Sequence, residues 1–308
     1  MTMRSPDRRW LQATLGATLL LAATGAPAQF NALKLLGSVS LGAPAPLQAP
    51  GSASGGDLMQ LLSQSLDQID EPKEIEIGRQ LAAVLLGSKP IHGDMALQAY
   101  VNRLGRWISL HGSRPTLPWA FVVIDDGGYN AFAAPGGYIF VTKGLIDRCA
   151  DEAELAGILA HEITHVTAKH HLHAMRKSAQ SGLLTQLVAS QIKTNAVGNL
   201  VASQVLALGR NLYSRGLDQT DEFDSDRNGV ALAARAGFDP FGLVAVLQQL
   251  RTATPDNPMF TLALSTHPPA QTRLDQLEQA MGKRLDGFAG APTITVAQRL
   301  GGSTRKKK

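Results

Sequence analysis

The chain has 308 residues, 44% of them hydrophobic and 18% charged, a composition typical of globular proteins and unlike fibrous or fully disordered chains. Its single cysteine, Cys149, excludes an intramolecular disulfide and a zinc cluster held by several thiolates. The formal charge of +4 lies at the ends: residues 1–28 carry a net +2 and the last four residues +4, which leaves the body at −2. The basic character therefore does not indicate a nucleic-acid-binding surface, and we expect no nucleic-acid partner.

The amino terminus predicts an export signal. A basic segment, Met1–Arg9, precedes the apolar run Leu11–Ala23, and Ala26-Pro27-Ala28 then supplies the small residues of a cleavage site. We expect a signal peptide over residues 1–28, cleavage near Ala28 and a periplasmic mature protein. The pair Arg8-Arg9 leaves the choice between general and twin-arginine export open.

Residues 29–56 predict a flexible linker, because sixteen of the twenty residues from Gly37 to Gly56 are Gly, Pro, Ser or Ala. Beyond it, residues 57–285 predict one domain, followed by a loose basic tail over 286–308. Hydrophobic periodicity within the domain predicts helices near 77–85, 97–108, 220–236, 240–251 and 268–282, a further helix that starts at about Asp151, and strands at 119–125 and 138–142. The largely apolar segment 182–208 is predicted as one or two amphipathic helices, with a membrane-docking element as the alternative.

The segment His161-Glu162-Ile163-Thr164-His165 lies on the third predicted helix. Two histidines four residues apart project from one helix face, so both imidazoles can reach one metal ion. Glu162 follows the first histidine directly, where its carboxylate can act on the attacking water without binding the metal. The pattern predicts a hydrolytic zinc site, which requires a third protein ligand and an open position.

Two sources for the third ligand can be compared. His171 has the spacing used by one group of zinc peptidases, but Ala168 stands where that group has the glycine that ends the helix. We therefore expect the helix to continue, and we interpret His170, His171 and His173 as surface or loop histidines. The acidic cluster around Glu222 and Asp226 is the better source, because these two residues are spaced to share one helix face.

Several short motifs in order then resemble those of the M48 peptidase family, in particular its bacterial periplasmic branch related to outer-membrane-assembly proteases. They are Asn130-Ala131-Phe132-Ala133 with Pro135-Gly136-Gly137, His161–His165 with His170, Tyr213-Ser214-Arg215, Glu222-x-Asp224-x-Asp226, Ala236-Gly237-Phe238-Asp239-Pro240, and Ser265-Thr266-His267-Pro268 with Arg273. The resemblance covers about residues 71–282. The family's E-x-E-A-D motif reads Glu222-Phe223-Asp224-Ser225-Asp226, which keeps its first and last positions.

The resemblance implies a predominantly helical α+β fold of the zincin type, with a small sheet beside the active-site helix. It implies one Zn²⁺ held by His161, His165 and Glu222, with Glu162 as the general base. It also implies that Asp226 orients one of the two histidines and that His267 faces the zinc across the cleft and stabilises the oxyanion.

An added substrate strand is expected along the strand that begins at Gly137 and Tyr138, with Asn130 shaping that edge. The function expected from all these features is a zinc-dependent endopeptidase for misfolded or unfolded envelope proteins, with the outer-membrane surface or the assembly machinery as a possible partner. The alternative is a periplasmic chaperone or assembly factor with a vestigial site. The presence of Glu162 beside all three ligands favours the enzyme, because a binding module has no chemical need for the base. An aminopeptidase would need an anionic pocket for the substrate amine, and the sequence indicates none.

Overall fold

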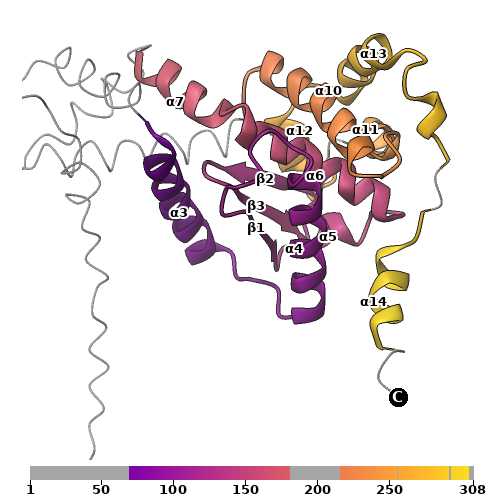
Figure 1. Cartoon of the computed structure of the whole chain (residues 1–308), viewed down its shortest axis with the longest axis horizontal. Helices are drawn as coiled ribbons and strands as arrows, with labels where there is room; N and C mark the ends of the chain where they lie inside the picture. The colour runs from indigo at the N-terminus through magenta and orange to yellow at the C-terminus, as the bar shows by residue number, and fades with distance from the viewer. Residues whose placement is uncertain (1–68, 181–215, 255, 291–292, 305–308) are drawn as a thin grey trace, which may run out of the picture. The chain divides into compact units, whose positions relative to one another are not determined.

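Helices and one small sheet make up the computed structural model, which describes residues 69–180, 216–254, 256–290 and 293–304 (Figure 1). The fold class expected from the sequence is confirmed. The expected signal peptide, linker and segment 182–208 lie outside the described residues. In chain order the elements are α3 (Glu71–Ser88), α4 (Met95–Ser109), β1 (Ala120–Ile124), β2 (Ala131–Ala134), β3 (Tyr138–Thr142), α5 (Lys143–Ile146), α6 (Glu152–Thr167), α7 (His170–Gln180), α10 (Gln219–Arg235), α11 (Gly242–Thr252), α12 (Thr261–Thr266), α13 (Ala270–Met281), a 3₁₀ turn at Asp286–Phe288, and α14 (Val296–Thr304).

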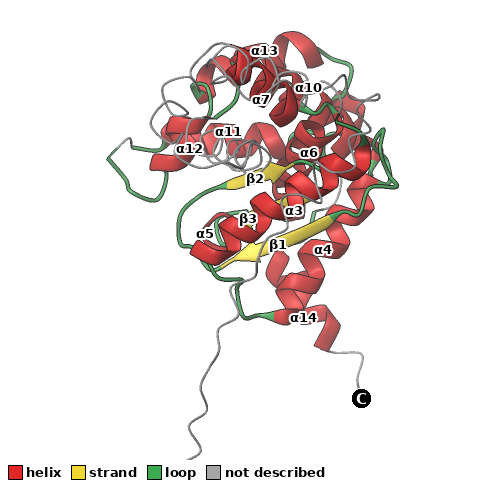
Figure 2. Cartoon of the chain, turned by 90° about the vertical axis from the view of Figure 1, so that its left-hand side faces the viewer, coloured by secondary structure: helices red, strands yellow, loops and turns green. Residues whose placement is uncertain are grey.

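The sheet separates two hydrophobic layers because successive side chains of a strand point to opposite faces. On β3, Ile139 and Val141 face the main core, which α4 and α6 share with the later helices. Phe140 faces a second cluster, in which α3 covers the other side of the sheet (Figure 2). Helices α6 and α3 are thereby held on either side of the same three strands.

The strand order is β1-β3-β2, with β3 parallel to β1 and antiparallel to β2. Both edges of β3 are therefore occupied, and the expected addition of a substrate strand at Gly137 and Tyr138 is wrong for this topology. Pairing on both sides leaves no main-chain donors or acceptors for a third strand. The outer strands are β1 and β2. The sequence did not predict β2, because it has only four residues, three of them alanine.

The carboxy-terminal part also differs from the expected loose tail. Residues Val296–Thr304 form α14, and the side chain of Val296 is buried in the main core. Arg299 binds the carboxylate of Glu152, at the start of α6, through two hydrogen bonds of 2.7 and 3.0 Å. The described helices include none long and apolar enough to cross a membrane.

A buried carboxylate joins α3 to the rest of the domain. Glu74 is 1% exposed and accepts two hydrogen bonds from Arg114, at 2.8 and 3.0 Å. Lys169 lies 3.1 Å from the same carboxylate, and the backbone N–H of Gly136 donates to it at 3.2 Å. Burial opposes ionisation, but the hydrogen bonds and charges of Arg114 and Lys169 outweigh it and lower the pKa of Glu74.

Gly136 has a φ of +77°, in the region that favours glycine, and a Cβ there would lie 2.5 Å from the Cα of Ile75. The turn between β2 and β3 can therefore approach α3 only without a side chain. Glu74 thus fixes three features at once: α3, the β2–β3 turn, and the chain just after α6.

We predict that Glu74→Gln lowers the free energy of unfolding by about 2–3 kcal/mol at pH 7, because it leaves two cations without their buried partner. The pKa of Glu74 in the folded protein is below its ordinary value near 4.5, so its contribution is complete above that value and is lost as the pH falls through the folded-state pKa. Urea unfolding at a series of pH values measures the difference between the two proteins, which should shrink below about pH 4.

Glu71→Gln is the matched control, because Glu71 contacts the same Arg114 but its side chain is 50% exposed. We expect it to change stability by less than about 1 kcal/mol. Equal effects of the two substitutions, or a Glu74→Gln difference that stays constant into acid, would contradict the role given to Glu74.

Candidate metal centre

Helix α6 presents both histidines and the intervening glutamate of the H-E-x-x-H segment. Asp151 caps it, accepting a hydrogen bond of 3.0 Å from the N–H of Glu154, so the helix begins where the sequence predicted. His161 and His165 are 3% and 2% exposed, and their Nε2 atoms lie 3.0 Å apart. Two ring nitrogens this close, on one helix face, can supply two of the ligands of one metal ion.

Helix α10 supplies the facing carboxylate. Oε2 of Glu222 lies 3.7 Å from Nε2 of His161, and Oε1 lies 3.6 Å from Nε2 of His165. Ligand atoms of a tetrahedral zinc, each about 2.0–2.1 Å from the ion, lie about 3.3 Å from one another. The three separations of 3.0, 3.6 and 3.7 Å therefore fit one zinc ion.

The two helices cross in direct backbone contact. A Cβ at Gly229 of α10 would lie 2.9 Å from both the Cα and the N of His161. Only glycine permits this approach, because backbone atoms cannot move aside as a flexible side chain can. Gly229 thereby brings Glu222, two turns earlier on α10, within reach of the histidines of α6.

A buried ion pair lies behind His161. Asp226 is 1% exposed and its Oδ1 lies 3.0 Å from Nδ1 of His161. Arg273 of α13, 4% exposed, donates to both oxygens of Asp226, at 2.5 and 2.8 Å. Of the two histidines between which the sequence left the choice open, His161 is therefore the one that Asp226 contacts.

The sequence analysis assigned no role to Arg273, although the pattern of its helix indicated that it pairs with a buried acidic residue. Arg273 interrupts the buried face of a helix otherwise lined by residues such as Leu277 and Met281. A buried arginine requires a buried anion, and Asp226 was the acidic residue expected beside the site.

The electrostatics of the site follow from burial and from these pairs. Burial raises the pKa of Glu162 and lowers the pKa of His165, which favours the neutral imidazole that a metal requires. Burial also opposes ionisation of Glu222 and Asp226. His267, His165 and His161 together outweigh it at Glu222, and Arg273 with His161 outweighs it at Asp226, so the pKa of each carboxyl lies well below its usual range. Both carboxyl groups are thus anionic at neutral pH.

His267 lies across the site from α6, where its Nδ1 is 2.6 Å from an oxygen of Glu222. The ligand atoms of His161, Glu222 and His267 all lie within 4.8 Å of one another. The separations of 3.0, 3.6 and 3.7 Å among His161, His165 and Glu222 are close to the tetrahedral value, whereas the 2.6 Å between His267 and Glu222 is too short for two ligand atoms of one zinc ion. His267 therefore fits the remaining, open side of the site.

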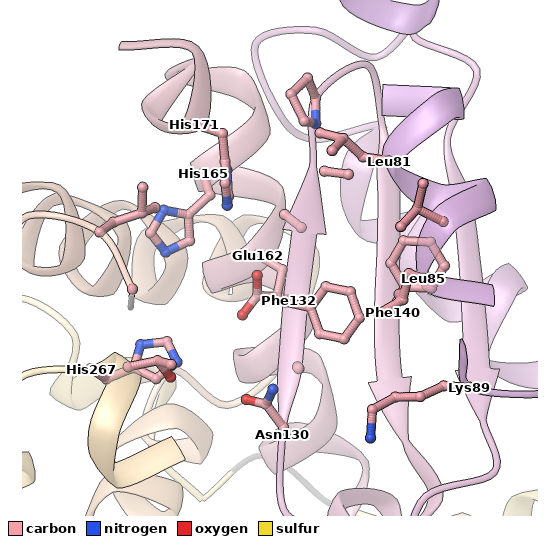
Figure 3. Close-up of a pocket in the computed structure, with 18 of the residues that line it drawn as sticks. Leu81, Leu85, Lys89, Asn130, Phe132, Phe140, Glu162, His165, His171 and His267 are labelled. Atoms are coloured by element: carbon pink, nitrogen blue, oxygen red, sulfur yellow. The ribbon is translucent and has the colours of Figure 1, made fainter. Parts of the chain in front are cut away.

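A cavity of about 340 Å³ opens beside these residues (Figure 3). Glu162, His165, Glu222 and His267 line one side, and β2 with Phe132 and the apolar residues of α3 lines the other. Asn130, which directly precedes β2, directs its amide into the cavity near Glu162. The edge of β2 that has no partner strand among the described residues therefore faces the same space as the candidate metal centre.

The histidines after α6 contradict the sequence interpretation. The helix ends at Thr167 although residue 168 is alanine, because Lys169 adopts a φ of +59°. His170 is 5% exposed and lies against His165, and His171 lines the cavity on α7. Neither is a surface or loop residue. His173 is exposed, as expected.

An H-E-x-x-H helix packed beside a small sheet places this fold among the zincin metallopeptidases. The model of peptidase family M48 matches residues 95–281, which is more than half of the chain. The chain belongs to this family, and the resemblance read from its motifs is confirmed.

Named relatives fall into two groups. The Escherichia coli (strain K12) "Beta-barrel assembly-enhancing protease" is 29% identical over 231 residues, which are 73% of this chain and 47% of that protein. The "Putative beta-barrel assembly-enhancing protease" of Vibrio cholerae is 29% identical over 252 residues, 76% of this chain and 48% of its own length. The "Mitochondrial metalloendopeptidase OMA1" of Schizosaccharomyces pombe is 28% identical over 195 residues, 61% of this chain and 56% of that protein. The chain thus spans about half the length of these relatives.

We predict that Gly229→Ala forces α6 and α10 apart, lowering the free energy of unfolding by about 1–3 kcal/mol and weakening zinc binding, because Glu222 moves relative to His161. Urea unfolding of the metal-free protein and chelator competition for zinc measure the two effects. Gly87→Ala is the matched control: it lies in α3, where the added Cβ meets no atom within 4 Å, and should leave zinc binding unchanged. Unchanged stability and zinc affinity in Gly229→Ala would show that the helices do not depend on this contact.

Proposed function

We propose that the protein is a zinc-dependent endopeptidase that cleaves unfolded or misfolded proteins of the cell envelope. The observation that carries the proposal is the placement of Glu162 beside three buried ligand groups and on the cavity that the free edge of β2 borders. Membership of peptidase family M48 supports the same activity.

His161, His165 and Glu222 would hold the zinc, since their atoms have the separations that one tetrahedral ion requires. A zinc ion bound there supplies Lewis-acid chemistry, by polarising the peptide carbonyl and making water more acidic. Asp226 fixes His161 through Nδ1 and is itself fixed by Arg273, so the ligand set is organised before substrate arrives.

Glu162 would take the proton of the attacking water and deliver it to the leaving amine. Its burial keeps bulk water away and raises its pKa, which makes the carboxyl a better proton acceptor than an exposed one. His267, on the opposite side of the site, would donate a hydrogen bond to the carbonyl oxygen as negative charge develops. Asn130 would hold the substrate backbone beside Glu162.

The substrate would bind as an extended strand along the outer edge of β2. Main-chain hydrogen bonds of this kind are available only in an unfolded or locally unfolded chain, and they carry little side-chain preference. A periplasmic location is supported by the export signal in the sequence and by the names of the bacterial relatives, which refer to β-barrel assembly. On the same grounds we propose that the protein's partner is the surface of the outer membrane or the machinery that assembles outer-membrane proteins.

We predict that Glu162→Gln keeps zinc but lowers casein cleavage by about 100- to 10,000-fold, because Glu162 moves the proton and does not bind the metal. Zinc content by atomic absorption and cleavage of labelled casein are measured on the same preparations. Equal cleavage by the two proteins would exclude the mechanism.

Glu222→Gln should weaken zinc binding by more than about 100-fold, because an anionic ligand is replaced by a neutral amide. His171→Ala is the matched control. His171 also lines the cavity, but the short distances between the proposed ligand atoms do not involve its ring. Chelator competition compares the two. A site emptied by His171→Ala and filled in Glu222→Gln would reverse the ligand assignment.

Substrate conformation should decide cleavage more than sequence does. We expect one test protein to be cut at several places when unfolded and to survive when folded, because only the unfolded chain can pair with β2. Mass spectrometry of the fragments from both forms maps the cut sites. Efficient cutting inside the folded form, or a single cut at a strict sequence, would exclude strand addition.

A further inference from the structure

The break between α6 and α7 has an unusual backbone. Lys169 has a φ of +59° and is the sole non-glycine residue with positive φ in the described ranges. A helix commonly ends with such a residue, but it is usually glycine, and another residue type costs about 1–2 kcal/mol. The side chain of Lys169 lies 3.1 Å from the buried Glu74, which holds the strained residue in place.

This break brings His170 back onto the preceding helix. In a continuous helix, residue 170 would lie about 140° around the axis from residue 165, on another face. After the break, Nδ1 of His170 is 3.1 Å from Nδ1 of His165, with the two rings nearly perpendicular at 78°. His170 is buried, so this contact is shielded from water.

The positions of the ring protons follow from the directions of the nitrogens. Nε2 of His165 faces His161 and Glu222, so a metal held there requires this nitrogen to carry no proton. The proton of His165 is then on Nδ1, and Nδ1 of His170 must accept it. The proton of His170 is left on Nε2, the side where the carboxylates of Asp224 and Asp221 lie, at 3.8 and 4.0 Å.

Ser225 completes the surroundings of His170. Its Oγ lies 3.2 Å from the same Nδ1 of His170. A neutral imidazole has one lone pair on this nitrogen, so the hydroxyl either shares it or turns its own proton elsewhere. The rigid ring of His165 has no such freedom, and its Nδ1–H has His170 as its one hydrogen-bond partner among the described residues.

We propose that His170 is a positioning residue for the metal ligand His165: the unprotonated Nδ1 of His170 accepts the Nδ1–H of His165 and keeps Nε2 of His165 directed at the zinc. The inference rests on the zinc site of the proposed function. The two histidine ligands are then oriented by different chemistry, His161 by the anionic Asp226 and His165 by a neutral imidazole.

Two substitutions separate the hydrogen bond from simple packing. His170→Asn retains an acceptor, because the Oδ1 of asparagine occupies the position of Nδ1, whereas His170→Leu fills a similar volume with no acceptor. We expect zinc affinity to fall about 10- to 100-fold in His170→Leu and to stay within about threefold of wild type in His170→Asn. Chelator competition measures the affinity, and the visible spectrum of the cobalt-substituted protein reports the ligand geometry. His173→Leu, an exposed histidine on the same helix, is the control that should change neither.

Wild-type zinc affinity in His170→Leu would overturn the proposal, as would equal losses in both variants when their metal-free forms melt at the wild-type temperature. If His170→Leu does not fold, nitrogen-15 NMR of the zinc-loaded wild type gives the answer directly. We expect the proton on Nδ1 of His165 and on Nε2 of His170, and a proton on Nδ1 of His170 overturns the proposal. These experiments measure zinc binding and not cleavage. A wild-type protein that binds zinc but cleaves nothing would therefore contradict the proposed function and leave the role of His170 supported.

Discussion

The buried ion pair between Asp226 and Arg273 is the interaction on which the site depends most. Two full charges, both less than 5% exposed, are tolerable in a protein interior only when each satisfies the other. Their pairing ties α10 to α13, and the second function of Asp226, at Nδ1 of His161, carries that constraint to α6. Three helices that are distant in sequence therefore have one relative position in which no buried charge is left unpaired. The metal ligands are on two of these helices, so their geometry follows from the same requirement.

Much of this arrangement was predictable from local patterns. The H-E-x-x-H spacing, the capping residue Asp151 and the i,i+4 pair Glu222 and Asp226 each depend only on neighbours along one helix, and the structure places all of them as expected. The strand at 138–142 was also predicted, because its β-branched and aromatic residues are a strong signal. What local patterns could not provide was the partner of each element, such as the arginine of α13 behind Asp226.

Two of the wrong expectations, on the edge of the sheet and on the end of α6, share one cause. The strand β2 is short and rich in alanine, so its own propensity predicts little, and without it β3 was taken as an edge. Helix α6 was expected to continue because Ala168 is not a helix breaker. It ends because Lys169 is held in a left-handed conformation by Glu74, which lies 95 positions earlier. In both cases a tertiary contact overrides the local preference, and His170 reaches His165 only as a result.

One edge of β2 has no partner strand in the part of the chain that the structure describes, and this has a consequence for the behaviour of the protein in concentrated solution. An unpaired strand edge is a surface on which two copies of a chain can join and begin to aggregate. Here the edge is four residues long and is followed at once by Pro135, which has no N–H to extend a ladder. The edge also lines a cavity, so a second folded copy meets the walls formed by α3 and α7 before it can pair. The walls of the cavity thus hinder two folded copies of the protein from pairing through this edge.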